Sequence, residues 1–361
     1  MSGEIERLTL PPGRRILVIS DIHGNLPYLK GVLDKAGFCD SDVLIIDGDF
    51  LEKGKYSLDT LRYIMELCRR GSTHVVRGNC DGWHMILHWD EEMAGRTLHY
   101  MDLRQNCLLR QMCRAVGVET DEWSDVEQVR HILREHYADE MAFLEKLPII
   151  IDTEHYTFVH GGISAPSAAE AEPQKCMKND NFLGQGLSFR KWQIVGHWPV
   201  VLYREDKTDA NPIILRDRKI VSIDGGCVLK DDGQLNCLII PEPGSEDFAW
   251  VYYDPFPTAE ALDSQAESVS SYYIRWGDNL VEVLAEGEEF SRCRHIRTGY
   301  EMDILTDFLK RTPNGITTND CTDYRLGVEA GERLSIVRRT SRGYLCKKNG
   351  VSGWYTGRLA E

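Results

Sequence analysis

Six side chains of types that bind metal ions follow five short apolar runs of the sequence. They are Asp21, His23, Asp49, Asn79, His160 and His197. Two divalent cations about 3.5–4 Å apart need a ligand set of this kind, with one carboxylate bridging both ions. We expect Asp21, His23 and Asp49 to bind one cation, and Asp49, Asn79, His160 and His197 to bind the other. Mixed imidazole and oxygen ligands favour manganese, iron, zinc or nickel over magnesium or calcium, and manganese is our first expectation.

The apolar runs before these residues predict the strands that position them. Runs at residues 15–20, 43–46 and 73–76 alternate with helical patterns at 26–36 and 57–69. This order predicts right-handed crossovers and a mainly parallel sheet. Further strands are expected at 147–151, 156–159, 193–195, 213–215, 220–223 and 237–240. Ligands in an open α/β sheet lie outside the carboxyl ends of the strands, so the six side chains should meet at one sheet edge.

Length and composition argue against several classes of protein. The 361 residues fit two or three domains, and the net charge of −15 makes nucleic-acid binding an unexpected main task. The sequence contains no apolar run of about 18 residues and no export signal, so we expect a cytoplasmic protein without membrane association. The 11 cysteines are scattered without a CxxC pair and are expected to be reduced.

Five segments together resemble the motifs of the calcineurin-like metallophosphoesterase superfamily: DIHGN, GDFLEKGKYS, GNCD, VHGGI and GHWP. The second segment is similar to the Gly-Asp-x-x-Asp-Arg-Gly block of the phosphoprotein phosphatase branch, and the bacterial Ser/Thr phosphatases are the nearest part of it. The resemblance covers about residues 14–240. It implies an α/β (α+β) fold with a central β-sandwich flanked by helices. It also implies that metal-bound hydroxide attacks phosphorus.

The chain departs from this family pattern beside the expected metal ligands. Cys80 stands where the family has a histidine that protonates the leaving oxygen, Glu52 where it has the supporting aspartate, and Lys53 where it has a phosphate-binding arginine. Loss of a general acid typically costs about 10²–10⁴ in rate. The alternatives for the acid are His84, Cys80 itself, or metal-bound water and solvent. Asp81 is expected to cap a following helix.

Two further residues are candidate contacts for the substrate phosphate. Asn25 ends the first motif and is expected to hydrogen-bond a substrate oxygen. Arg190 precedes the strand that leads to His197 and is a candidate second cationic contact, after Lys53. The competing interpretation of Arg190 is a charged side chain that is simply solvated.

A domain boundary is expected near residue 245. Residues 1–245 are the expected phosphoesterase domain with a helical cap at about 84–146. The segment 246–271 is an expected linker, because PEPGSED at 241–247 and the apolar-poor stretch 255–271 are both linker signals. The segment GERLSIVRRTSRGYLCKKNGVSGWYTGRL resembles bacterial Src-homology-3-like domains, which implies a small β-barrel at 312–361. A weak internal repeat indicates a degenerate first copy at 272–311. Such barrels imply a peptide partner or self-association.

The leading hypothesis for function is a dinuclear-metal phosphoesterase that hydrolyses phosphomonoesters, including phosphoserine or phosphothreonine in proteins. The alternative enzyme is a phosphodiesterase or a hydrolase of nucleotides or dinucleoside polyphosphates. The alternative of another class is a weakly active metal-binding scaffold that acts through its C-terminal barrels. The complete set of six ligands favours an enzyme, because a scaffold has no need of all of them.

Overall fold

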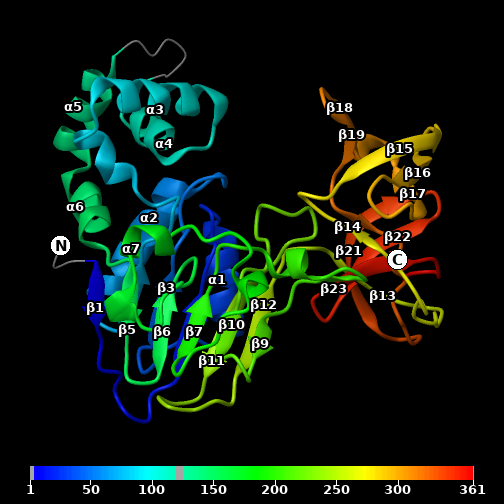
Figure 1. The fold of residues 1–361 in the computed structure, drawn as a ribbon, viewed down its shortest axis with the longest axis horizontal. Helices are drawn as coiled ribbons and strands as arrows, with labels where there is room; N and C mark the ends of the chain where they lie inside the picture. The colour runs from blue at the N-terminus through cyan, green and yellow to red at the C-terminus, as the bar shows by residue number, and fades with distance from the viewer. Residues whose placement is uncertain (1–3, 119–124, 361) are drawn as a thin grey trace. The chain divides into compact units, whose positions relative to one another are not determined.

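The computed structural model describes residues 4–118 and 125–360, which divide into two compact units. The first unit comprises Met1–Pro199, Pro212–Leu229 and Gly233–Asp254, and the second comprises Val200–Asn211, Lys230–Asp232 and Pro255–Glu361. Figure 1 shows the helices and two sheets of the first unit and the short strands of the second. Among the described residues, no helix combines the length and the apolar character needed to cross a membrane.

Two stacked sheets form the centre of the first unit. One contains, in order of pairing, β12 (Ala249–Tyr253), β11 (Leu235–Ile240), β2 (Ile16–Ile19), β3 (Val43–Asp47) and β4 (Thr73–Val76). The other contains β1 (Ile5–Arg7), β5 (Ile150–Asp152), β6 (Tyr156–Val159), β7 (Trp192–Val195), β10 (Ile220–Ser222) and β9 (Ile213–Leu215). Strands β2, β3 and β4 are parallel, but β11 is antiparallel to β2. The sheets are therefore mixed, and the expectation of one mainly parallel sheet holds for part of each, because β6, β7 and β10 of the second sheet are also parallel.

Alternate side chains of one strand enter two different cores. In β2, Ile16 and Val18 pack between the sheets, whereas Leu17 and Ile19 pack against the helices. Side chains of a strand alternate between its two faces, so a strand that is covered on both faces is apolar throughout. This double burial explains why the sequence shows a continuous apolar run here.

Helices α1 to α6 supply the core on the face of the first sheet that lies away from the second sheet. They are α1 (Leu26–Lys35), α2 (Ser57–Arg69), α3 (Glu91–Leu103), α4 (Leu108–Ala115), α5 (Val126–His136) and α6 (Ala138–Lys146). The short helix α7 (Pro173–Cys176) and the 3₁₀ helices η1 (Trp83–Leu87), η2 (Ala168–Glu170) and η3 (Phe182–Gln185) also belong to the first unit. Helix α2 buries Leu58, Leu61 and Ile64 on one face. The expected cap at 84–146 is mostly helical, and residues 119–124 of that range lie outside the described residues.

The segment expected to be a linker, 246–271, is part of the folded structure. Phe248 packs in the core between the two sheets, with its ring centroid 4.6 Å from that of Trp192. Strand β12 pairs with β11, and β13 (Thr258–Glu260) pairs with β21 (Arg333–Thr340) inside the second unit. The first unit therefore extends to Asp254 rather than ending near residue 245.

The second unit is built mainly from short antiparallel strands. One sheet contains, in order, β13, β21, β22 (Gly343–Lys348), β23 (Val351–Tyr355) and β8 (Thr208–Asp209). Another contains β17 (Glu301–Leu305), β16 (Phe290–His295), β15 (Leu280–Ala285), β19 (Gly315–Thr318) and β18 (Leu309–Thr312), while β14 (Tyr273–Ile274) pairs with β20 (Cys321–Thr322). The expected boundary at 311 falls inside β18. The pairings define β-rich structure, and they do not show closed barrels within the described residues.

Candidate metal centre

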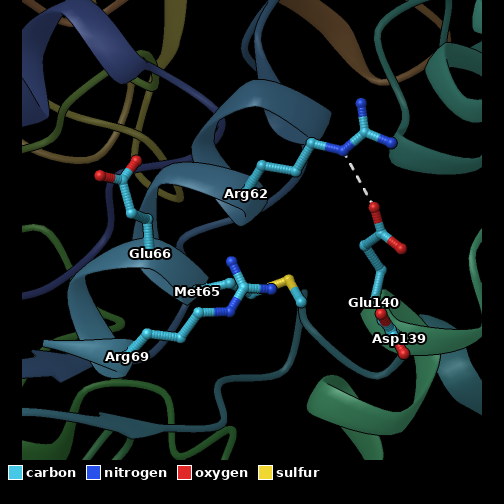
Figure 2. A pocket seen from close by; sticks show the side chains of 6 residues that line it. All are labelled: Arg62, Met65, Glu66, Arg69, Asp139 and Glu140. Atoms are coloured by element: carbon cyan, nitrogen blue, oxygen red, sulfur yellow. Dashed lines mark hydrogen bonds and ion pairs between the residues drawn. The ribbon is translucent and has the colours of Figure 1, made fainter. Parts of the chain in front are cut away.

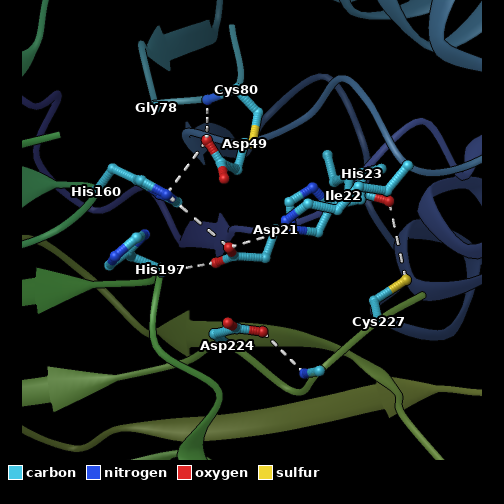
Figure 3. A network of polar contacts seen from close by, with 12 residues as sticks. Asp21, Ile22, His23, Asp49, Gly78, Cys80, His160, His197, Asp224 and Cys227 are labelled. Atoms are coloured by element: carbon cyan, nitrogen blue, oxygen red, sulfur yellow. Dashed lines mark hydrogen bonds and ion pairs between the residues drawn. The ribbon is translucent and has the colours of Figure 1, made fainter. Parts of the chain in front are cut away.

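The predicted metal ligands follow the carboxyl ends of five strands, β2, β3, β4, β6 and β7. Strands β2, β3 and β4 belong to one sheet, whereas β6 and β7 belong to the other. The side chains thus converge from two stacked sheets rather than from the edge of one. Figure 3 shows Asp21, Asp49, His160 and His197 pointing toward a common centre, with His23 beside them.

Unusual backbone conformations turn these side chains inward. Asp21, His23, Asp49 and His197 have φ angles of 55°, 49°, 50° and 66°, a region that residues other than glycine rarely adopt. Backbone hydrogen bonds hold the turns in place: the N–H of Asp21 donates to the carbonyl of Gly48 at 3.0 Å, and that of His23 to the carbonyl of Asp49 at 2.9 Å. Strain of this kind persists where the surrounding structure fixes it, as it does at many functional sites.

Two groups of donor side chains share one carboxylate. The first group is His23, Asp49 and Cys80, and the second is Asp49, His160 and His197, with the ligand atoms of each group within 4.8 Å of one another. Asp21 lies between the groups, with its Oδ1 3.8 Å from Nε2 of His23 and 3.9 Å from Nε2 of His160. This buried Oδ1 accepts no hydrogen bond from the described residues. An orphaned carboxylate oxygen among ring nitrogens fits a site for cations.

Backbone carbonyls orient the two most buried histidine rings. Nδ1 of His160 lies 2.8 Å from the carbonyl oxygen of Asp47, and Nδ1 of His23 lies 3.3 Å from that of Leu51. When Nδ1–H donates to a carbonyl, Nε2 carries the lone pair. The Nε2 atoms that approach Asp21 would therefore be the ligand atoms if these histidines bind a cation.

The charges of the site also fit cations. Burial opposes a charge on His160, but Asp49 and Asp21 outweigh it and raise the pKa of His160 well above its usual value. Burial, together with the ammonium of Lys53, lowers the pKa of His23 to about 3. Burial raises the pKa of Asp21, and the nearby carboxylate of Asp224 adds to this rise. The negative charges of Asp49 and Asp21, which favour a proton on His160, would also favour a metal ion there. A metal ion that binds displaces protons from its ligands.

The turn after β4 places Asn79 and Cys80 beside Asp49. The backbone N–H of Cys80 donates to Oδ1 of Asp49 at 2.7 Å, and Nδ2 of Asn79 lies 3.2 Å from the sulfur of Cys80. Asn79 is exposed, and its amide oxygen is the atom that would bind a metal. Burial, with Asp49 adding to it, raises the pKa of the Cys80 thiol well above its usual value.

His84 is paired with Arg77 rather than with a metal ligand. It is 4% exposed in η1, and its Nε2 lies 3.3 Å from Nη1 of Arg77. Burial and the Arg77 guanidinium lower the pKa of His84 to about 4. A neutral imidazole is a poor proton donor, so this arrangement does not favour His84 as the general acid.

Glu52 contacts the helical segment instead of supporting an acid beside Cys80. Its Oε2 accepts a hydrogen bond from the hydroxyl of Tyr100 at 2.8 Å, and its Oε1 accepts one from the backbone N–H of Leu108 at 2.7 Å. Leu108 is the first residue of α4, whose N-cap residue supplies no side-chain hydrogen bond. The buried carboxylate therefore ties the loop after β3 to α3 and α4.

The three residues predicted to contact the substrate lie in three different surroundings. Nζ of Lys53 lies 3.3 Å from Nε2 of His23, so this cation is next to the metal ligands. Asn25 precedes α1, and its Nδ2 lies 3.8 Å from the sulfur of Cys227. Arg190 is exposed and precedes β7, whose opposite end leads to His197. The structure thus brings Lys53 to the ligands and leaves Arg190 at the other end of its strand.

Asp81 connects the loops that follow β3 and β4, and it does not cap a helix. Its carboxylate accepts hydrogen bonds from the backbone N–H groups of Asp49 at 2.8 Å, Leu51 at 3.2 Å and Gly78 at 2.8 Å. The expectation of a helix cap was wrong, because only a 3₁₀ helix follows and its N-cap is Gly82. Supporting groups of this kind position metal ligands.

Two more aspartates complete the surroundings of the ligands. Oδ1 of Asp180 lies 2.7 Å from Nε2 of His197 and orients that ring. Asp224 is fully buried, and its Oδ1 accepts a hydrogen bond from the N–H of Gly226 at 2.8 Å. Asp224 follows the apolar strand β10, so the strand-end rule that predicted the metal ligands could have drawn attention to it. Asp180 lies in a loop and has no such signal.

A separate pocket of about 440 Å³ lies between α2 and α6 (Figure 2). It is lined by Arg62, Met65, Glu66, Arg69, Asp139 and Glu140. Charges of both signs line it, and Arg62 donates to Glu140 at 2.9 Å. None of the predicted metal ligands lines this pocket.

Comparisons with known proteins agree with the site. The family model described as calcineurin-like phosphoesterase matches residues 14–223, more than half of the chain. No curated protein matches. A solved structure of a candidate diadenosine tetraphosphatase is 17% identical and has a TM-score of 0.46, with 70% of this chain and 99% of that chain covered.

Two further solved structures are similar to this chain. A protein serine/threonine phosphatase from Saccharomyces cerevisiae is 10% identical with a TM-score of 0.43, covering 71% of this chain and 85% of its own. A metallophosphoesterase from Sphaerobacter thermophilus is 18% identical with a TM-score of 0.40, covering 66% and 88%. The assignment rests on the family model. This chain belongs to the calcineurin-like phosphoesterases, a family of metal-dependent phosphoric ester hydrolases.

Proposed function

We propose that this enzyme uses two divalent cations to hydrolyse phosphomonoesters, with phosphoserine or phosphothreonine in proteins as the substrate class. The observation that carries the proposal is the sharing of Asp49 by two groups of donor side chains. A shared carboxylate is typical of centres that hold two metal ions. When bound, such a pair activates water near neutral pH and neutralises charge on the phosphate.

The side chains around Asp49 take distinct roles in this proposal. Asp21 and His23 hold one cation with Asp49, while Asn79, His160 and His197 hold the other, and manganese is the first ion to test. Lys53 lies beside His23 and offers a single positive charge to a phosphate oxygen. This local charge matters, because the chain as a whole has a net charge of −15 that repels anionic substrates.

A second candidate function is hydrolysis of a phosphodiester, or of a phosphoanhydride in a nucleotide or dinucleoside polyphosphate. This candidate is favoured because two side chains that could have helped to protonate the leaving group make other contacts. Glu52 contacts Tyr100 and Leu108, and His84 contacts Arg77. A good leaving group, such as a nucleotide, needs protonation least.

Turnover of three substrates tests the proposal. p-Nitrophenyl phosphate, bis-p-nitrophenyl phosphate and a dinucleoside tetraphosphate are compared with Mn²⁺ and after chelation. The variants are Asp49→Asn and Asp217→Asn, in which Asp217 is an exposed turn residue and serves as the matched control. We expect metal-dependent monoester turnover that falls at least about 10²-fold in Asp49→Asn and is unchanged in Asp217→Asn.

Each other outcome has a clear meaning. Preference for the diester or the dinucleoside tetraphosphate would replace the monoester proposal by the second candidate. Absence of turnover of all three substrates by a metal-loaded protein would overturn both.

A further inference from the structure

Cys80 occupies a position from which its sulfur can reach a metal ion. Its sulfur, a carboxylate oxygen of Asp49 and a ring nitrogen of His23 lie within 4.8 Å of one another. Figure 3 shows Cys80 above Asp49, with its backbone N–H directed at the carboxylate. The sequence placed Cys80 where an acid was expected, but its neighbours in space are metal ligands.

A further carboxylate oxygen without a hydrogen-bond partner lies next to this group. Oδ1 of Asp21 is 3.8 Å from Nε2 of His23, and it accepts no hydrogen bond from the described residues. Asp21 is 1% exposed, so solvent does not satisfy this oxygen. One imidazole, two carboxylates and one thiol make four donors, which is the number that zinc prefers in proteins.

Hydrogen bonds hold both the backbone and the sulfur of Cys80. Its N–H is held at 2.7 Å by Oδ1 of Asp49, and Asp49 is in turn held by the N–H bond to the carboxylate of Asp81 at 2.8 Å. Nδ2 of Asn79 lies 3.2 Å from the sulfur, on the side chain that precedes it. The backbone of Cys80 is therefore held by Asp49, and its thiol is contacted by the amide of Asn79.

We propose that Cys80 is a thiolate ligand of the cation held by His23, Asp49 and Asp21, and not a proton donor to the leaving group. This inference rests on the proposed dinuclear site and deepens it. On binding, the thiol proton passes to solvent and a metal–sulfur bond forms.

A sulfur ligand changes which metal this position selects. Thiolates bind zinc, and soft or borderline ions in general, better than they bind manganese. The other position, with His160, His197 and the oxygen ligands, has no sulfur within its group. The two positions would then differ in metal preference, with the softer ion at Cys80.

Cobalt titration tests the ligand assignment directly. Wild type, Cys80→Ser and Cys227→Ser are titrated with Co²⁺, and bound cobalt is measured by equilibrium dialysis. Cys227 is the matched control, because its sulfur lies near the first motif, 3.8 Å from Nδ2 of Asn25. We expect a thiolate-to-cobalt charge-transfer band in wild type and Cys227→Ser that is absent in Cys80→Ser. The preference for zinc over manganese should fall at least about tenfold in Cys80→Ser.

A second measurement uses only the wild type and does not depend on folding of a variant. Bound zinc should protect Cys80 from iodoacetamide, as read by peptide mass mapping, whereas the exposed Cys39 should react equally with and without zinc. Equal alkylation of Cys80 in both states of a zinc-loaded protein would refute the assignment.

The outcomes separate this inference from the proposed function. Wild type that binds cobalt without the band, a band that persists in Cys80→Ser, or failure of wild type to bind cobalt would each overturn it. Turnover of p-nitrophenyl phosphate is measured in the same samples. Turnover without the band removes the ligand assignment alone, whereas the band without turnover supports the assignment and counts against the phosphatase.

Discussion

At the scale of single residues, the position of a side chain in the sequence indicates its neighbours only where backbone geometry fixes its direction. Asp21 and Asp49 follow β2 and β3, a parallel pair whose ends share one sheet edge, so their convergence was predictable. His160 follows β6 in the other sheet, and its approach to them depends on how the two sheets stack. His84 lies beyond a turn, and its contact with Arg77 depends on the fold around it. Asp81 lies two residues after the predicted ligand Asn79, yet its three backbone partners lie on two loops.

The contact with Arg77 makes His84 a source of pH-dependent stability. Burial and Arg77 lower its pKa from 6.5 to about 4, so the folded protein binds this proton less readily than the unfolded chain does. The contribution of the neutral ring is complete above pH 6.5 and is lost as the pH falls toward 4. We therefore expect His84→Gln to reduce the fall in stability between pH 7 and pH 5.

Urea unfolding midpoints of wild type, His84→Gln and His99→Gln at both pH values check this expectation. His99 is exposed and serves as the control. An equal fall in all three proteins would show that His84 does not titrate with a lowered pKa.

At the scale of elements, the side chain of Glu52 connects the loop after β3 to helices α3 and α4 of the expected cap. The apolar periodicity of α2 and the apolar runs of β2 and β3 were sufficient to predict those elements, because each is buried on defined faces. The link between Glu52 and the start of α4 was not predictable, since the two residues it joins, Glu52 and Leu108, are 56 positions apart. Long-range hydrogen bonds of this kind leave no local pattern in the sequence.

Removal of the Glu52 carboxylate should loosen the helices from the loop. Glu52→Ala leaves the buried N–H of Leu108 and the hydroxyl of Tyr100 without their acceptor, and each loss costs roughly 1–3 kcal/mol. We expect a lower free energy of unfolding, together with a coupling to Tyr100→Phe of about 0.5–3 kcal/mol in a double-mutant cycle. Effects of the two substitutions that simply add would contradict the contact.

At the scale of the whole molecule, the polar runs at 241–247 and 255–271 were a poor guide to the domain boundary. The linker interpretation passed over the apolar run AWVYY between them, which forms β12, the outer strand of its sheet. The segments Val200–Asn211 and Lys230–Asp232 belong to the second unit although they interrupt the first in sequence. Composition along the chain does not reveal that such short segments belong to the other unit. Peptide binding or self-association by the second unit stays a prediction.

Phe248 distinguishes a folded segment from a linker. Because its ring packs between the sheets against Trp192, Phe248→Ala should lower the free energy of unfolding by about 3–5 kcal/mol. Val269, in the same expected linker, is fully exposed, and Val269→Ala should change stability by no more than about 0.5 kcal/mol. Chemical denaturation of both variants checks this, and equally small effects would restore the linker interpretation.

The metal content of wild type and Asp49→Asn tests the central claim most directly, because Asp49 belongs to both groups of donors. After loading with divalent metal and removal of the excess, elemental analysis should find about two ions per wild-type chain and about one or fewer in Asp49→Asn. Asp217→Asn should match wild type. Two ions retained by Asp49→Asn, or one or none bound by wild type, would contradict a dinuclear centre built on this carboxylate.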